Sequence, residues 1–156
     1  MKKYLFCLII TLALSQSGFG QDLNQLLKKV SETENIEKVK IGRFLMTIGK
    51  AFGDVNDMPV AKGIHSMEVY TLSDCSHEFK KDFSKQFNSI KDGNGYETLI
   101  YAKDKKDAVR IMIKKQKNII REMVILCMDE SEPTIVKFSG KIQENDIAEL
   151  IKKYDK

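Results

Sequence analysis

The spacing of the apolar residues changes near residue 95, from a helical repeat to an alternating one. Before that point, stripes of apolar residues three or four positions apart predict three amphipathic helices. The stripes are Leu23, Leu26, Leu27 and Val30; then Phe44, Leu45, Ile48, Ala51 and Phe52; and then Phe79, Phe83, Phe87 and Ile90. Between the helices, 64–72 predicts a strand, and 36–41 predicts a short strand or extended segment.

Helix boundaries follow from capping residues. Asp22 is suited to cap the first helix, with Gln25 three residues later. Gly53 follows the second stripe, where a left-handed residue ends many helices. Ser73 or Asp74 is the predicted cap of the third helix.

Four strands joined by polar turns follow residue 95, over 96–102, 109–114, 119–128 and 134–138. In the second of these, alternation predicts that Val109, Ile111 and Ile113 form the buried side. In the fourth, apolar residues also alternate, at Thr134, Val136 and Phe138. A last apolar stripe, Ile147, Leu150, Ile151 and Tyr154, predicts a C-terminal helix.

This order of elements indicates an α+β fold. Consecutive strands with short turns predict a mostly antiparallel sheet whose C-terminal part is a four-strand meander, covered by three or four helices. The segment 123–128 is apolar on both faces, as in a central strand, and we expect Phe79, Phe83 and Phe87 to pack against it. Residues 21–156 are enough for one domain with its own core.

The first twenty residues predict a signal peptide. Lys2 and Lys3 precede an apolar run over 4–14 that is too short to span a bilayer, and Gly18 and Gly20 fit the cleavage positions. We therefore expect 1–20 to be cleaved and the rest to be exported to the periplasm or the exterior. Cys7 lies inside the apolar run and 15–21 contain no cysteine, so lipid attachment is not expected.

Charge argues against a nucleic-acid partner. Of the 26 basic side chains, Lys2 and Lys3 belong to the predicted signal peptide, which leaves 24 against 22 acidic ones. Only three of the basic residues are arginine, the side chain best suited to bidentate recognition of phosphate and guanine. Export makes such a partner less plausible still.

Basic residues gather around one predicted strand and its turns, opposed by Asp104 and Asp107. They are Lys103, Lys105, Lys106, Arg110, Lys114, Lys115 and Lys117. One interpretation is a surface for an acidic envelope protein or another anionic surface, such as lipid headgroups. The other is that lysines on an exposed face or edge prevent strand pairing between molecules.

The two cysteines of the mature chain raise two further hypotheses. Cys75, if it lies in the first turn of the third helix, would have a thiol activated by the helix dipole, with His77 as the candidate base of a small thiol enzyme. However, residues two apart on a helix do not face each other. Alternatively, Cys75 and Cys127 could form a disulfide after export, or both could be buried as small apolar residues.

No motif indicates a cofactor. His65 and His77 lie on different predicted elements, and no pair of His or Cys has metal-ligand spacing. The acidic turn 129–132 lacks the glycine-containing loop of an EF-hand, and Gly93 and Gly95 lack the helix and lysine of a phosphate loop. We expect no bound metal and no cofactor.

Taken as a set, several segments resemble a family of exported bacterial proteins known as a domain of unknown function. They are 39–46, 64–72 with the Phe79–Phe83 helix, 95–99, 109–113, and 138–142 before Asp146 and Ile147. The position after Gly140 is acidic in that pattern, and Lys141 here departs from it. The resemblance implies an envelope protein, with some relatives encoded near extracytoplasmic-function sigma factors, and it implies no activity.

Together these observations predict a non-enzymatic exported domain that acts by binding another envelope component. The alternative is a small exported enzyme that uses Cys75, assisted by His77 or His65. A third hypothesis, a scaffold in envelope stress signalling, depends on the family resemblance alone.

Overall fold

The computed structural model of the chain describes residues 22–42 and 62–148. The predicted signal peptide, the predicted helix over 44–52 and the apolar residues after Ile147 lie outside these ranges.

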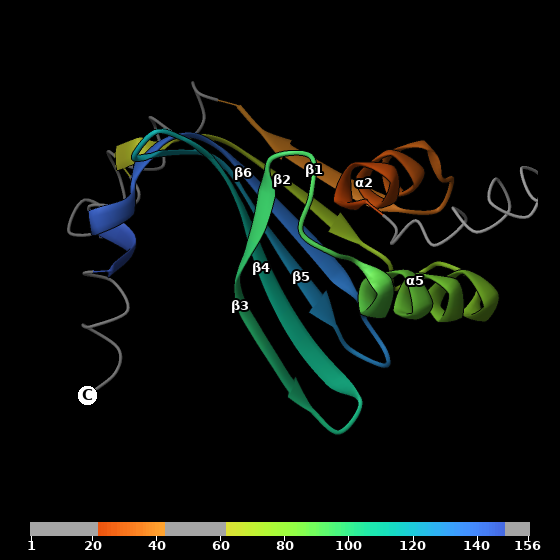
Figure 1. Cartoon of the computed structure of the whole chain (residues 1–156). Coiled ribbons are helices and arrows are strands. Elements are labelled where there is room, and N and C mark those ends of the chain that lie inside the picture. Colours follow the sequence, from red (N-terminus) through yellow and green to blue (C-terminus); the bar gives the residue numbers. More distant parts are fainter. Residues whose placement is uncertain (1–21, 43–61, 149–156) are drawn as a thin grey trace, which may run out of the picture.

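The described residues form two long helices and six strands (Figure 1). The helices are α2 (Leu23–Glu32) and α5 (His77–Ser89). The strands are β1 (Glu37–Ile41), β2 (Ile64–Thr71), β3 (Tyr96–Asp104), β4 (Asp107–Gln116), β5 (Ile119–Met128) and β6 (Thr134–Gln143). A short helical segment over 144–148 follows β6.

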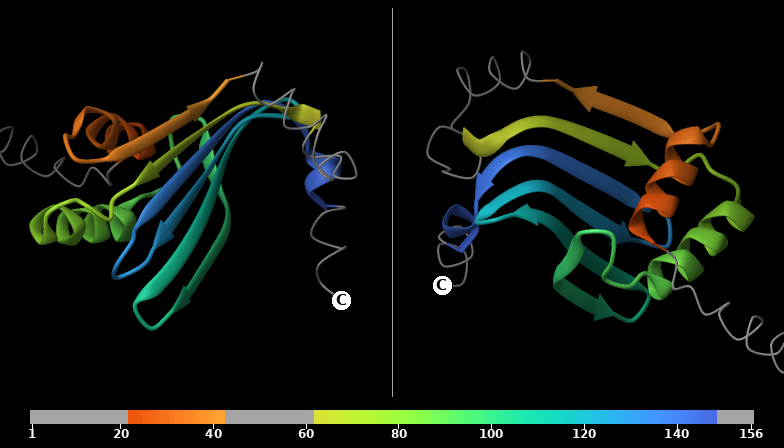
Figure 2. Two further views of the ribbon diagram at one scale, coloured as in Figure 1. Left: turned by 180° about the vertical axis from the view of Figure 1, so that it is seen from behind. Right: turned by 45° about the horizontal axis from the view of Figure 1, so that its top comes forward.

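All six strands belong to one antiparallel sheet in the order β1-β2-β6-β5-β4-β3. This confirms the α+β prediction and the C-terminal meander of β3 to β6. Strand β2 pairs with β6, so the chain crosses from one side of the sheet to the other through α5 before β3 begins. Both long helices lie over the same face of the sheet (Figure 2).

The main core fills the space between these helices and the sheet. Phe83 and Phe87 of α5 are fully buried beside Val124 and Leu126 of β5, and the half-buried Phe79 packs against the same cluster. The predicted packing of the α5 phenylalanines on the central strand is therefore confirmed. Burying such side chains supplies most of the driving force for docking the helix.

The alternation within β4 predicts the buried side only in part, because Ile113 is fully buried as expected but residues of the other face are buried too. Met112 is fully buried under the helices, whereas Val109 is 36% exposed on the other face. In β6, likewise, Ile135 is fully buried, while Val136 and Phe138 are only partly buried. The reason is that both faces of these strands carry apolar residues, so alternation alone does not identify the face that the helices cover.

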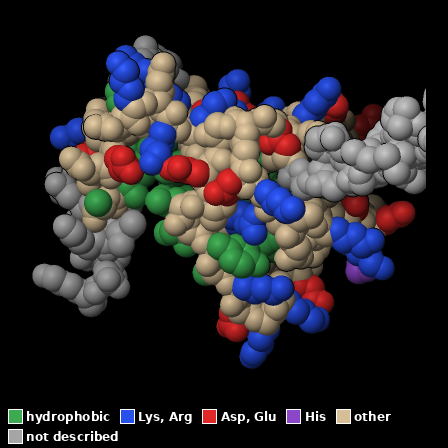
Figure 3. Space-filling model, viewed as in Figure 1, with side chains coloured by type: hydrophobic (Ala, Val, Ile, Leu, Met, Phe, Trp, Pro, Cys, Tyr) green, Lys and Arg blue, Asp and Glu red, His purple; other side chains and the backbone are tan. Residues whose placement is uncertain are grey.

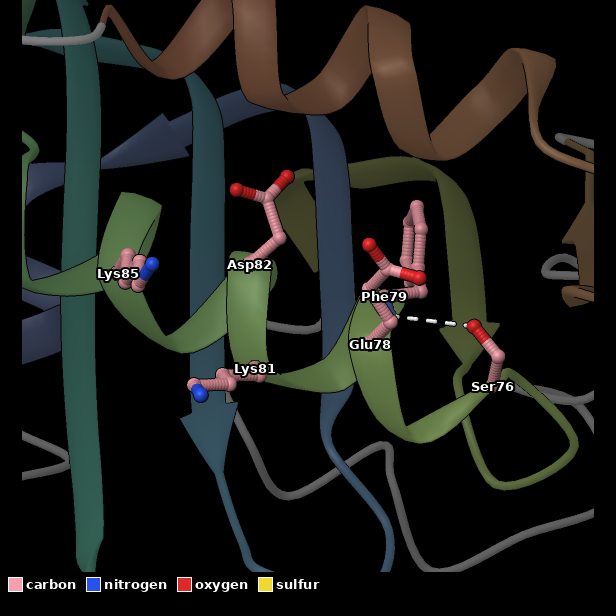
Figure 4. A pocket seen from close by; sticks show the side chains of 6 residues that line it. All are labelled: Ser76, Glu78, Phe79, Lys81, Asp82 and Lys85. Atoms are coloured by element: carbon pink, nitrogen blue, oxygen red, sulfur yellow. Dashed lines mark hydrogen bonds between the residues drawn. The ribbon is translucent and has the colours of Figure 1, made fainter.

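The cap of α2 is the residue predicted from the sequence, whereas the cap of α5 is a different residue. The Asp22 carboxylate accepts a hydrogen bond from the backbone N–H of Asn24. The cap of α5 is Ser76, whose Oγ accepts from the backbone N–H of Phe79 at 3.2 Å, and not Ser73 or Asp74 (Figure 4). Cys75 therefore lies outside the helix.

Strands β2 and β6 approach closely where their ends meet. Gly140 lies opposite Ile64, and a Cβ atom at Gly140 would be 2.1 Å from the carbonyl oxygen of Gly63. A Cβ at Gly63 would be 2.6 Å from the carbonyl oxygen of Lys141. Only glycines allow this contact, next to a bulge between Ile64 and Ser66.

Candidate functional site

The predicted basic cluster is divided between the two ends of β4. Lys103, Lys105 and Lys106 lie at the tip of the β3–β4 hairpin, whereas Lys114, Lys115 and Lys117 lie at or beyond the opposite end of β4. A ten-residue strand separates ends by about 30 Å. The seven basic residues therefore form no single surface.

At the far end, two of the lysines have local partners. The Lys115 ammonium is 2.6 Å from Glu97 and 3.5 Å from Glu144. Lys114 lies over the ring of Tyr96, with its Nζ 5.4 Å from the ring centroid. Lys117 begins the two-residue turn between β4 and β5. We therefore interpret these three lysines as structural residues of the β4–β5 hairpin and the adjacent sheet edge.

Arg110 has a structural role inside the helix-facing side of the sheet. Its guanidinium stacks over Tyr101 at 4.7 Å and Phe87 at 5.6 Å, and Nη1 donates to the backbone carbonyl of Ile90. It thereby joins the C-terminal end of α5 to β3 and β4. Its Nε is buried without a hydrogen-bond partner. Because the two rings cover the guanidinium plane and Nη1 is bonded to the end of α5, we remove Arg110 from the candidate ligand-binding set.

The hairpin-tip lysines line a pocket of about 280 Å³ between α5 and the sheet. Lys103 lies opposite Ala108 in the register, so it belongs to the sheet face that α5 covers. The pocket brings together α5, the β3–β4 turn, β5 and the residues after it. We name it the hairpin pocket; its lining consists of Ser84, Phe87, Asn88, Lys103, Lys105, Lys106, Ala108, Met128 and Glu130.

The hairpin pocket combines an apolar part with basic and neutral polar groups. Phe87, Ala108 and Met128 are the apolar lining residues, and the rest carry ammonium, amide, hydroxyl or carboxylate groups. Three lysines face one acidic residue, Glu130, which is 2.8 Å from Lys106. Asp104 and Asp107 flank the turn but do not line the pocket. Figure 3 shows basic and acidic side chains around the hairpin end of the molecule.

The ion pair between Lys106 and Glu130 raises the pKa of Lys106, because the hydrogen bond to the carboxylate favours the charged ammonium. Both side chains are more than two-thirds exposed, so the pair is screened by water and its partners can exchange. A ligand anion could therefore take the place of Glu130. Lys103 and Lys105 have no ion-pair partner among the described residues.

The backbone at the pocket is unusual at Lys105. Its φ is 52°, in the left-handed region that disfavours residues with a Cβ atom. The turn that contains it has two residues, because Asp104 and Asp107 are paired on either side. The conformation places a lysine where glycine or asparagine would fit with less strain.

A larger depression of about 480 Å³ lies along α5 (Figure 4). Its six lining residues all come from α5 and its cap: Ser76, Glu78, Phe79, Lys81, Asp82 and Lys85. In Figure 4, the labelled side chains of Lys81, Asp82 and Lys85 point in different directions. Because one helix forms all the walls and its charges do not converge, we prefer the hairpin pocket despite its smaller volume.

The two cysteines are free and lie on opposite faces of the sheet. Cys75 packs against the main core under the helices, whereas Cys127 pairs in register with Val109 on the other face. The suggested disulfide is therefore not formed, because the sheet separates the two thiols.

The local environment of Cys75 also differs from that of an activated thiol. Burial raises its pKa, and this effect outweighs the lowering by the nearby Lys80, while Asp74 adds a smaller rise. The thiol lies 3.6 Å from the backbone carbonyl of Asn35, and His77 is an exposed residue of the first turn of α5. The dipole argument for Cys75 was wrong in its premise, because the helix begins after Ser76.

The described ranges contain neither a metal-ligand cluster nor a membrane-spanning helix. Within 22–42 and 62–148, no group of three or more His, Cys, Asp or Glu side chains is placed to hold a metal ion. No helix within the same ranges has both the length and the apolar composition needed to cross a membrane.

Sequence reasoning found three pocket lysines and missed the other lining residues. Ser84, Asn88 and Glu130 are separated from the lysines by at least 15 positions in the chain, so no local motif connects them. Phe87 was identified, but only as a core residue. The available signal was the polar edge of the α5 stripe, since Ser84 lies three positions before Phe87 and Asn88 lies one position after it.

Comparison with known proteins identifies a family for the chain. No curated protein and no solved structure matches the chain. A family model described as "Domain of unknown function (DUF4252)" matches residues 27–150, which include every described strand and α5. The chain therefore belongs to the family of the DUF4252 domain of unknown function.

Proposed function

We propose that this protein is an exported, non-enzymatic binding domain that holds an acidic segment of another cell-envelope protein in the hairpin pocket. The observation that carries the proposal is the convergence of Lys103, Lys105 and Lys106 on one pocket with an apolar floor. Ammonium groups attract carboxylates, and the apolar residues provide contact area for the side chains between them.

The geometry supports a short acidic peptide better than a small metabolite. The pocket is open, and two of its lysines lie in the hairpin turn, so a chain could continue past it on either side. Exposed lysines are point charges without fixed bidentate geometry, which favours recognition of charge density over recognition of one rigid group. We expect modest affinity that falls as salt is added.

Export supports the choice of an envelope partner. Lys2, Lys3 and the apolar run over 4–14 have the pattern of a signal peptide, which would bring the domain into contact with envelope proteins. The periplasm or the exterior is therefore the proposed location.

Binding is preferred to thiol catalysis because of the environment of Cys75. Burial raises the pKa of this thiol, so at neutral pH the nucleophilic thiolate is less populated than in an ordinary cysteine. No described observation favours the enzyme that uses Cys75 and His77, and we propose no second function.

The proposal is tested by the binding of a fluorescent hexaglutamate peptide, followed by anisotropy at low and at physiological salt. Wild-type protein should bind the peptide, more strongly at low salt. The double variant Lys103→Glu, Lys105→Glu should lose most of the binding, because it reverses two of the charges that line the pocket.

A matched control removes the same total charge elsewhere. Lys117→Glu with Lys141→Glu places the reversal at the other end of the sheet, where β4 and β6 end. This variant should bind the peptide nearly as well as wild type. Equal losses in the two double variants would mean that net charge alone attracts the peptide, and would overturn the proposal. Phosphatidylglycerol vesicles form a second arm: binding to vesicles without binding to the peptide would assign the pocket to a membrane surface instead.

A further inference from the structure

The sheet has a second apolar face, which points away from α2 and α5. The central row of this face runs across all six strands, because residues paired in register share a face. It contains Val39, Val69, Val136, Ile125, Ile111 and Ile100. No charged residue interrupts it.

Parts of this face are open. Val39, Ile100 and Val109 are 45%, 38% and 36% exposed, and the residues between them are only partly buried. Hydrophobic side chains are visible on the side of the sheet away from the helices in Figure 3. Both long helices of the described ranges pack on the opposite face. A continuous apolar surface across a sheet indicates a contact.

One described residue near the C-terminus already packs on this face. Ile147, in the helical segment over 144–148, packs against a second buried cluster, as Met123 and Phe138 also do. The cluster consists of Ile64, Ile113, Ile120 and Ile142. Met123 and Phe138 are paired in register and lie one step along the strands from Ile125 and Val136. The chain therefore leaves the described structure at the border of the open apolar row.

The sequence after this contact continues the same stripe. Leu150, Ile151 and Tyr154 follow Ile147 at intervals of three, four and seven residues, the spacing of one helix face. Lys152, Lys153 and Lys156 fall outside that stripe. A helix over the thirteen residues 144–156 would be about 20 Å long, close to the width of about 24 Å between the outer strands of a six-stranded sheet.

The shape of the sheet favours a helix over a second copy of the chain. The end that carries residues 144–148 bends toward the side opposite α2 and α5, which makes the apolar face concave there (Figures 1 and 2). Two concave sheets facing each other would leave a gap between them. A single helix, about 10 Å across, fills such a hollow.

We propose that the C-terminal segment of this chain, from Ile147 to Tyr154, docks as a helix on the apolar face and covers its central row. The sheet then has helices on both faces, which explains why its central strands are apolar on both sides. The proposal is independent of the hairpin pocket, which lies under α5 on the other face.

The test uses thiol accessibility on the two faces of one molecule. Val136→Cys in a Cys127→Ser background places a thiol in the central row, and the native Cys75 on the other face is an internal reference. Alkylation by iodoacetamide under native conditions is followed by mass spectrometry. Ending the chain at Ala148 should increase the rate at position 136 several-fold and leave the rate at Cys75 unchanged.

Point variants of the full-length protein test the proposal even if the shortened chain unfolds. In the full-length protein, Ile151→Asp should increase the rate at position 136, whereas Lys152→Asp, outside the stripe, should not. Equal rates at position 136 in the full-length protein and Ile151→Asp would overturn the proposal. Protection that disappears on dilution of the full-length protein would also overturn it, in favour of a second copy as the occupant.

Discussion

Lys105 and Lys117 each begin a two-residue hairpin turn in the left-handed conformation, with φ of 52° and 56°, but only Lys105 lines the pocket. Residues with a Cβ atom pay roughly 1 kcal/mol or more for this conformation, and glycine does not. Replacing the lysine with glycine would relieve this strain. The larger conformational freedom of glycine in the unfolded chain offsets roughly 0.5–1 kcal/mol of the stability gained in this way. Backbone strain that has no evident structural benefit is a feature of functional positions.

We therefore expect Lys105→Gly to leave stability unchanged or to raise it by up to about 1 kcal/mol, while weakening hexaglutamate binding. Lys117→Gly should have the same effect on stability and none on binding. Urea denaturation and peptide anisotropy measure the two effects. A loss of binding in both variants, or in neither, would contradict the assignment of Lys105 to the pocket.

Glu122 is a partly buried carboxylate that contacts Tyr96 of the main core. Its Oε2 accepts from the hydroxyl of Tyr96 at 2.6 Å and lies 2.8 Å from the ammonium of Lys137. Burial alone would raise the pKa of Glu122, but the hydrogen bonds from Lys137 and Tyr96 outweigh it, and the pKa falls below its ordinary value of 4.5. Burial, and then the same contact with Glu122, raises the pKa of Tyr96.

A lowered folded-state pKa means that this carboxylate stabilises the protein above the unfolded-state pKa, and that the stabilisation is lost as the pH falls through the folded-state value. Glu122→Gln should thus cost about 1 kcal/mol at pH 7 and progressively less below pH 4.5. Thermal melts across this range measure the difference. The exposed Glu34→Gln is the control, and a cost at Glu122 that is the same at every pH would refute the argument.

At the scale of elements, helices were easier to predict than the faces of strands. The stripes of α2 and α5 each have one apolar side, so the period identified their buried apolar residues, although it did not identify the buried Gln86. Strands β4, β5 and β6 are apolar on both sides, and the choice of Val109 over Met112 was wrong for that reason. The cap at Ser76 was missed because Ser73, Asp74 and Ser76 all have side chains that favour this position.

The contact between β2 and β6 depends on two glycines that the sequence alone did not single out for this role. We expect Gly140→Ala to destabilise the protein by about 1–3 kcal/mol, since the new Cβ would be 2.1 Å from the backbone oxygen of Gly63 and the strands would have to separate. Gly93→Ala is the matched control, because nothing lies within 4 Å of a Cβ there. Denaturant midpoints compare the two, and similar small losses would show that the contact relaxes without cost.

At the scale of the whole molecule, the order of the strands was beyond prediction from local pattern. Hairpins follow from short turns, but the insertion of β2 between β1 and β6 joins segments about 70 residues apart. The same limit applies to the site. Seven basic residues close in sequence suggested a common surface as one of two interpretations, but the length of β4 separates them. Ser84, Asn88 and Glu130 are instead brought to the pocket by the fold.

The central claim is that acidic chains are held at the hairpin pocket, and the most direct measurement is an NMR titration of the ¹⁵N-labelled protein with hexaglutamate. The account predicts that amide shifts concentrate at Ser84, Asn88 and residues 103–108, and that residues 114–118 stay unchanged. The shifts should diminish when salt is added. Shifts centred on 114–118, or spread evenly over the surface lysines, would contradict the account.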